Sequence, residues 1–202
     1  MNREDYVKYA PAFGMKPEFY DFTADNTNVP EKEFEKCQKV LNWDTSSAKG
    51  FYLYGRTGNG KSHFLKVKAN SLVVKKIDGI VNRFYSEKYP QWIEHTEYLK
   101  DLMPNGSFDR ERAHRIERYV DEVKNADWLF IDDFGATTKS EWSINETFKL
   151  IDARVASKKQ TFVSSNLDPN EILHHFGERI QSRMFELCTF IKFEGIDRRK
   201  LL

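Results

Sequence analysis

Short apolar runs alternate with longer segments of helical periodicity along most of the chain. The runs FYLY (51–54), WLFI (128–131) and TFVSS (161–165) are apolar or β-branched throughout, which is typical of strands buried on both faces. The segments QWIEH (91–95) and TFIKF (189–193) alternate more between apolar and polar residues, so we expect them nearer the edges of a sheet.

Helices are predicted between these strands, at Ser62–Lys76, Phe108–Asn125, Glu141–Ser157 and Pro169–Phe185. Asp168, followed by Pro169 and Glu171, predicts a helix start, and Thr138 with Glu141 predicts a similar capping box. Strands that alternate with helices of this length predict a parallel sheet with helices on both faces. The expected fold class is therefore α/β.

The first 30 residues combine prolines with scattered aromatic residues and carry no long periodic segment. We expect residues 1–30 to form an extended arm that binds a partner, with packing along its own core as the equal alternative. Residues 31–202 are then a single core, as the total length of 202 residues allows.

Charge, cysteine spacing and the N-terminal residues argue against a strongly basic nucleic-acid-binding protein, a CxxC protein and a secreted protein. Lys and Arg total 32 against 31 Asp and Glu, so any surface that binds nucleic acid must be local. Cys37 and Cys188 form no CxxC motif, and the N-terminus lacks a signal-peptide core. We therefore expect a cytoplasmic protein without a membrane span.

The stretch GRTGNGKS matches G-x-x-x-x-G-K-[ST] between an apolar strand and a helix. Such a loop wraps phosphates in its backbone N–H groups; its lysine, Lys61, would reach the β- and γ-phosphates, and the Ser62 hydroxyl would bind Mg²⁺. The alternative is a glycine-rich turn with an incidental lysine. The residues expected to bind the nucleotide here are Gly55, Arg56, Thr57, Gly58, Asn59, Gly60, Lys61, Ser62 and His63.

Two polar strand ends complete the predicted site. In WLFIDDFG, Asp132 would hold Mg²⁺ and Asp133 would orient or deprotonate the attacking water, unless both lie in a solvated turn. Asn166, at the end of TFVSSN, would contact the γ-phosphate or that water. Equally, Ser164, Ser165 and Asn166 could simply begin the next turn.

The order of these motifs resembles a known family. The segments GFYLYGRTGNGKSHF, ADWLFIDDFGAT, LIDARVASKKQTFVSSN and GERIQSRMFE resemble AAA+ ATPases of the bacterial helicase-loader group, with DnaC, DnaI and the IstB transposition helpers. The resemblance covers about residues 13–199 and includes FYDFTADN. It implies a P-loop ATPase of the AAA+ type that hydrolyses ATP with Mg²⁺, built on a five-stranded parallel core.

The resemblance also assigns roles near the C-terminus. Asn166 matches the sensor-1 residue, and Arg183 matches the arginine finger that reaches a neighbouring subunit's nucleotide, with Arg179 assisting. The alternative for both arginines is a surface ion pair with Glu178 or Glu186.

Arg199 in GIDRR resembles the sensor-2 residue; its neighbour Arg198 and a simple charged tail are the alternatives. Only 36 residues follow Asn166, so we expect little or no C-terminal helical lid. Some 30 to 45 residues precede the phosphate-loop strand, too few for the N-terminal helicase-binding domain of the loaders.

The resemblance implies a helicase loader that places a replicative helicase on single-stranded DNA. An IstB-like transposition helper and a nucleotide-switched adaptor without significant hydrolysis are the other hypotheses. Arginines in the segment 108–125 could contact DNA, although its interspersed acids favour a solvated face.

Overall fold

The computed structural model describes residues 2–25, 33–82, 88–103 and 109–195. In chain order these residues form α1 (Arg3–Tyr9), η1 (Ala10–Phe13), η2 (Pro17–Asp21), α2 (Phe34–Leu41), β1 (Gly50–Tyr54), α3 (Lys61–Val81), β2 (Pro90–Glu94), α4 (His95–Leu102), α5 (Arg110–Asn125), β3 (Trp128–Phe134), α6 (Glu141–Ser157), β4 (Gln160–Ser165), α7 (Pro169–Phe176), α8 (Glu178–Leu187) and β5 (Cys188–Lys192). The elements η1 and η2 are 3₁₀-helices.

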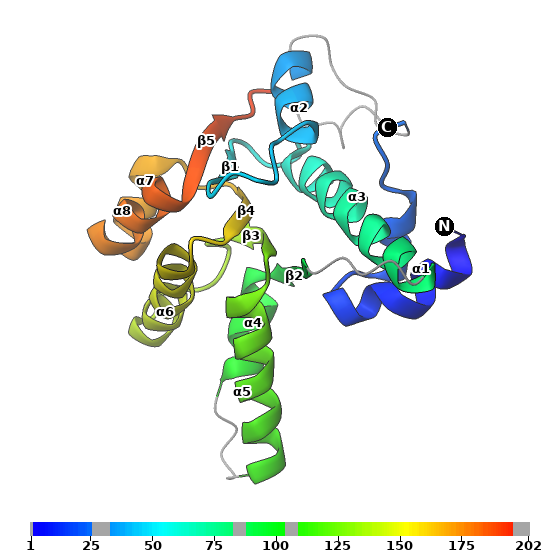
Figure 1. Ribbon diagram of the computed structural model, residues 1–202. Coiled ribbons are helices and arrows are strands. Elements are labelled where there is room, and N and C mark those ends of the chain that lie inside the picture. The colour runs from blue at the N-terminus through cyan, green and yellow to red at the C-terminus, as the bar shows by residue number, and fades with distance from the viewer. Residues whose placement is uncertain (1, 26–32, 83–87, 104–108, 196–202) are drawn as a thin grey trace.

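The strands form one parallel sheet in the order β2-β3-β4-β1-β5 (Figure 1). The α/β class and the parallel sheet are confirmed. The two segments with the more alternating pattern, β2 and β5, lie at the edges, as expected. No helix in the described ranges combines the length and hydrophobicity needed to cross a bilayer.

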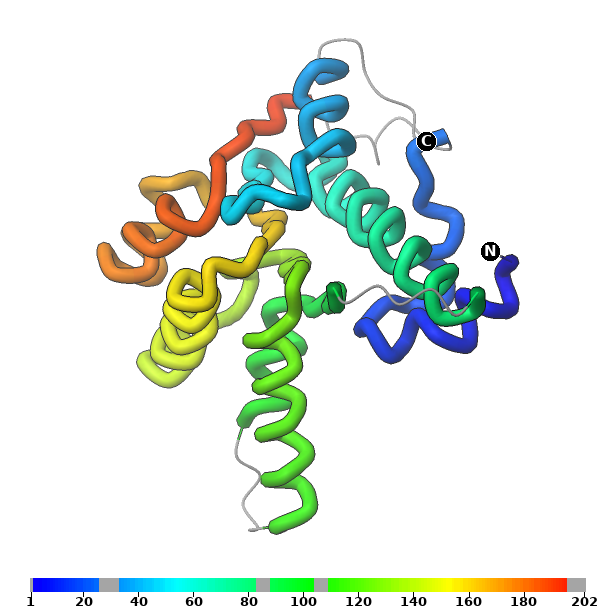
Figure 2. Tube along the Cα trace, in the orientation of Figure 1, coloured from blue at the N-terminus to red at the C-terminus, as the bar shows by residue number. Residues whose placement is uncertain are grey.

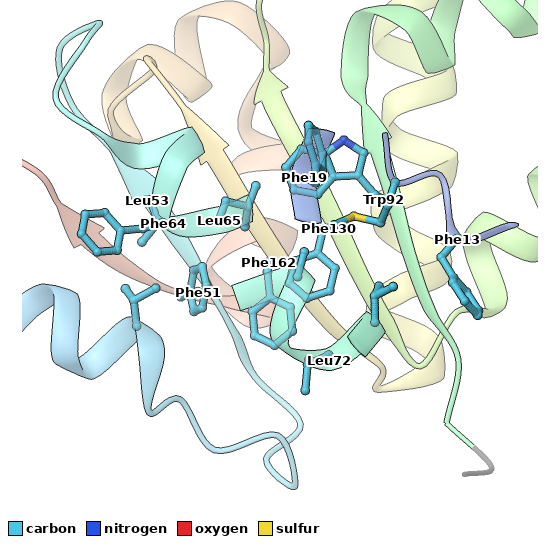
Figure 3. Packing of buried hydrophobic residues seen from close by; sticks show 14 of the residues in the cluster. Phe13, Phe19, Phe51, Leu53, Phe64, Leu65, Leu72, Trp92, Phe130 and Phe162 are labelled. Carbon is cyan, nitrogen blue, oxygen red and sulfur yellow. The ribbon is translucent and has the colours of Figure 1, made fainter. Parts of the chain in front are cut away.

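Successive residues of the central strands contribute to opposite faces of the sheet. On one face Phe51, Phe130 and Phe162 pack against α3, with ring centroids 4.8 Å apart for Phe51–Phe162 and 4.9 Å for Phe130–Phe162 (Figure 3). On the other face Leu129 and Ile131 pack under the helices α4 to α8. Burial on both faces explains why these strands are continuously apolar.

The N-terminal segment packs along the core and does not form the extended arm expected. Tyr6, Phe13 and Phe19 are buried among the side chains under α3. Gly14 has φ of +71°, and a Cβ there would lie 2.2 Å from the Trp92 carbonyl oxygen, so only glycine permits this close approach to β2. Figure 2 shows this segment beside α3. The division of the chain at residue 30 stays a prediction.

The predicted helices exist with three corrections. The helix predicted over Pro169–Phe185 is broken at Gly177, whose φ of 88° and ψ of 168° only glycine adopts readily, into α7 and α8. The capping box of α6 is Ser140 with Ser143, two residues after the expected Thr138 and Glu141.

The third correction concerns α3, which continues beyond Lys76 to Val81. The predicted cap of α7 is confirmed, since Asp168 and Glu171 form a reciprocal capping box. Helix α5 begins after its cap Asp109 and extends away from the sheet (Figure 2).

Candidate functional site

The motif Gly55–Ser62 follows β1 directly and its last two residues begin α3, the strand-to-helix context that it requires. Gly55, Gly58 and Gly60 have φ of 139°, 81° and 98°, which L side chains rarely adopt. A Cβ on Gly55 would also lie 2.1 Å from the Phe193 carbonyl oxygen. A glycine turn of this kind at a helix N-terminus makes an anion-binding concavity.

Lys61 is held inside the loop and is only 5% exposed. Its Nζ donates to the carbonyls of Gly55 and Arg56, both at 2.8 Å, and to Asn59 Oδ1 at 3.0 Å. Asn59 is fully buried and donates from Nδ2 to the Phe193 carbonyl at 2.8 Å. Asn59 therefore fixes the loop to the end of β5 and orients the lysine.

The two acids at the end of β3 lie at a break in the strand register. Pairing with β4 shifts between Ile131 and Phe134, so Asp132 and Asp133 occupy a bulge. Asp132 is 4% exposed, whereas Asp133 is exposed and has φ of 49°. The bulge therefore directs one carboxylate into the protein and turns the other out toward solvent.

Asp132 is connected to the phosphate loop through β4. The Ser164 hydroxyl donates to Asp132 Oδ1 and lies 3.4 Å from Ser62 Oγ. Lys66 Nζ lies 4.0 Å from Asp132 Oδ2. Carboxylate and hydroxyl oxygens are ligands that Mg²⁺ prefers, so Asp132 and Ser62 fit a magnesium site.

The pKa of Asp133 is raised above its usual range. Partial desolvation is the largest cause, followed by the negative charges of Asp132 and Glu94, while Lys61 and Lys66 lower it. A carboxyl whose charge is disfavoured in this way has the character of a proton acceptor, which is what activation of a water requires.

A cavity of about 470 Å³ opens beside the loop. Its lining combines the N-terminal segment, the phosphate loop, α3 and the ends of β3 and β4: Phe22, Thr57, Gly58, Gly60, Lys61, Ser62, His63, Lys66, Asp133, Ala136 and Asn166. The fold thus brings most of the predicted nucleotide-binding residues to one place, together with Asp133 and Asn166.

Three lining residues, Phe22, Lys66 and Ala136, were not predicted. The Phe22 ring lies 5.2 Å from the His63 ring, and Lys66 Nζ lies 5.0 Å from the Phe19 ring and 5.6 Å from that of Phe22. The position of Lys66 four residues after Ser62 was a usable signal, because such residues share a helical face. Nothing in the local pattern indicated the approach of Phe22.

Asn166 is exposed and lines a second hollow of about 600 Å³ as well as the first. Arg56 and Gly55 contribute to this second hollow, together with Asp168, Glu171 and other residues at the start of α7. Asn166 therefore stands where the two hollows adjoin.

Of the predicted C-terminal arginines that the structure describes, neither Arg183 nor Arg179 lines the cavity. Arg183, on α8, is 42% exposed and pairs through Nε with Asp152 at 3.0 Å and through Nη1 with Glu186 at 3.1 Å. Arg179 lies over the Phe148 ring at 4.2 Å. The Glu186 pair is the surface ion pair left open above, and the finger role stays a prediction. Arg198 and Arg199 lie outside the described residues.

Comparison with known proteins identifies relatives. A family model, the bacterial DnaA ATPase domain, matches residues 18–188. The replicative helicase loader DnaI of Bacillus subtilis (strain 168) is 29% identical over 169 residues, which cover 77% of this chain and 49% of DnaI. The chain therefore spans about half the length of this curated relative.

Solved structures share the fold. A crystal structure of DnaI matches with a TM-score of 0.67 at 21% identity, covering 89% of this chain and 95% of that chain. AMPPCP-bound DnaA from Aquifex aeolicus matches with a TM-score of 0.64 at 19% identity, covering 86% of this chain and 50% of that chain.

The family model spans most of the chain, from the N-terminal segment that carries Phe22 to the start of β5, and so includes the phosphate loop, both acids and Asn166. The chain belongs to the family of bacterial DnaA ATPase domains and is an AAA+ ATPase related to the helicase loader DnaI.

Proposed function

We propose that the chain is an ATP-dependent helicase loader that acts in DNA replication. It binds and hydrolyses ATP at a subunit interface and places a replicative helicase on single-stranded DNA. The observation that carries the ATPase part is the cavity that gathers Lys61, Ser62, Asp133 and Asn166 beside one phosphate loop. The similarity to the helicase loader DnaI supports the loading part.

Each side chain has a role set by its chemistry. The loop N–H groups and Lys61 would bind the phosphates, and Ser62 with Asp132 would hold Mg²⁺, which when bound would supply positive charge beside the phosphates. Asp133 orients or deprotonates the attacking water. Asn166 contacts the γ-phosphate or that water from the end of β4.

The proposed interface uses α8. Arg183 is partly exposed and lies outside its own chain's cavity, so its guanidinium can turn to a neighbouring subunit by exchanging its pairs with Asp152 and Glu186. There it stabilises the charge that develops on the γ-phosphate, with Arg179 assisting. Arg199 is the proposed sensor-2 residue.

The ATPase proposal is tested with two substitutions. We expect Lys61→Ala to abolish ATP binding, and Asp133→Asn to retain binding while turnover falls ~10²- to 10⁴-fold, the range of general-base catalysis. The measurements are binding of a fluorescent ATP analogue and release of phosphate. Asp121→Asn, an exposed acid on α5, is the matched control and should change neither.

Turnover in Asp133→Asn equal to that of the unmodified protein would remove Asp133 from the mechanism. ATP binding without any turnover, with or without single-stranded DNA, would instead favour the nucleotide-switched adaptor. Pull-down of a replicative helicase supports the loader, and pull-down of a transposase in its place supports the IstB-like helper.

A further inference from the structure

We propose that Ser164 is a positioning residue that joins the two predicted Mg²⁺ ligands, Ser62 and Asp132, through its buried hydroxyl. The proposal rests on the function proposed above, since it concerns the metal that accompanies ATP. Ser164 is fully buried at the end of β4, 102 residues from Ser62 and 32 from Asp132 in sequence.

The order of strands creates the need for such a residue. Because β4 lies between β1 and β3, the loop that follows β1 and the acids that end β3 are separated by two strand spacings, ~10 Å. Ser164 pairs with Leu53 of β1 on one side and faces the β3 bulge on the other. A hydroxyl on this middle strand can contact both sides at once.

The hydrogen bonds have one consistent direction. The single Ser164 hydroxyl proton is donated to Asp132 Oδ1. The Ser164 oxygen then accepts from the Asp133 backbone N–H at 3.3 Å and from the Ser62 hydroxyl at 3.4 Å. The chain of donors runs from Ser62 through Ser164 to Asp132.

This direction determines which oxygens face a cation. The Ser62 proton is directed to Ser164, which leaves the Ser62 lone pairs for a metal. Asp132 Oδ1 is engaged by Ser164, whereas Oδ2 lies 4.0 Å from Lys66 Nζ, beyond hydrogen-bond distance. Ser164 thus sets the rotamer of Ser62 and the rotation of the Asp132 carboxylate together.

The neighbouring residue provides a matched control. Ser165 is also fully buried, but its hydroxyl donates to the Phe134 carbonyl and accepts from the Leu167 N–H at 3.0 Å. Replacing Ser165 therefore removes a buried hydroxyl and two hydrogen bonds from the same strand without touching Ser62 or Asp132. A purely structural role for Ser164 predicts equal effects of the two changes.

The experiment measures the affinity for a fluorescent ATP analogue in EDTA and across a series of Mg²⁺ concentrations. In EDTA we expect Ser164→Ala to bind the ATP analogue as tightly as the unmodified protein does. It should need ~10- to 100-fold more Mg²⁺ for the same gain in affinity for the analogue, which is the usual effect of removing a group that orients a metal ligand. Ser165→Ala should need no more Mg²⁺ than the unmodified protein, and Ser164→Thr, which keeps the hydroxyl, should recover most of the loss.

An unchanged Mg²⁺ requirement in Ser164→Ala, an equal loss in EDTA and Mg²⁺, or the same shift in Ser165→Ala would each overturn the proposal. If Ser164→Ala does not fold, Ser164→Cys takes its place, because the thiol fills similar space but donates weakly. Absence of ATP binding by the unmodified protein would instead refute the proposed function.

Discussion

His95 is a fully buried histidine whose two ring nitrogens both have partners. Its Nδ1 accepts from the Gly135 N–H at 3.3 Å, so Nε2 carries the proton and donates to Thr147 Oγ1 at 3.1 Å. Thr147 in turn donates to the Ser143 carbonyl at 2.7 Å. The neutral ring thereby links the turn after Asp133 to α6.

Charging this ring is unfavourable. Burial, with a smaller contribution from His175, lowers the pKa of His95 to about 4. The unfolded chain, with a histidine pKa of about 6.5, binds more protons between these values, so stability is lost as pH falls through this window. We expect a loss of about 3 kcal/mol in unfolding free energy between pH 7 and pH 4 from this residue.

Urea unfolding at a series of pH values measures the effect as a difference between variants. His95→Gln cannot be protonated and should show a flatter pH dependence, whatever its stability at pH 7. His114→Gln, at an exposed site on α5, is the control and should follow the unmodified protein. Parallel profiles for His95→Gln and the unmodified protein would contradict this role of His95.

Among the elements, α6 is fixed to its neighbours by a buried arginine. Arg154 is fully buried and donates from Nε to Thr161 Oγ1 at 3.0 Å, from Nη2 to the Gln160 carbonyl at 2.6 Å, and from Nη1 to the carbonyls of Lys124 and Ala126. Burial lowers its pKa to about 10, so the group stays charged at neutral pH. One side chain thus joins α6 to the end of α5 and the start of β4.

Replacing Arg154 should therefore destabilise several elements at once. We expect Arg154→Met to lower the unfolding free energy by about 3 kcal/mol, because it leaves buried carbonyls without donors. Urea unfolding measures this, and Arg118→Met, on the exposed face of α5, should stay within about 0.5 kcal/mol of the unmodified protein. Equal effects of the two changes would show that the Arg154 hydrogen bonds contribute little.

Elements were predictable from sequence where local pattern and burial agree. The strands around Phe130 and Phe162 are apolar because both faces are covered, and this signal is present in any short window. The break at Gly177 and the cap at Ser140 each depend on the backbone conformation of one residue. The sequence around them does not show which residue adopts that conformation. Periodicity alone therefore placed one helix where the chain forms two.

At the scale of the whole molecule, the site depends on segments that only the fold brings together. The phosphate loop and the acids of β3 were predictable because each motif is contiguous. To predict the Phe22 contribution, one must know how the N-terminal segment packs. To predict the Ser164 contact between Ser62 and Asp132, one must know the order of the strands. Neither is encoded in a local spacing.

Assembly is the remaining requirement of the proposed mechanism. If Arg183 acts on a neighbour's nucleotide, specific ATPase activity should rise with protein concentration as subunits associate. We expect Arg183→Ala to abolish this rise and to lower turnover at high concentration ~10³-fold, the lower end of arginine-finger effects. Phosphate release across a dilution series measures both quantities.

Arg3→Ala provides the control, since Arg3 lies near the N-terminus, far from Arg183 in sequence, and makes an exposed ion pair with Asp21 at 3.4 Å. It should leave the concentration dependence intact. Unchanged turnover and unchanged concentration dependence in Arg183→Ala would mean that Arg183 serves only its pairs with Asp152 and Glu186.

The bulge at the end of β3 has a consequence for engineering. Asp133 holds a left-handed backbone conformation, which costs a non-glycine residue ~1 kcal/mol or more. Asp133→Gly would relieve that strain while deleting the carboxylate. A library selected for thermal tolerance alone would therefore favour loss of the group that the proposed chemistry needs, so such selections need a simultaneous screen for turnover.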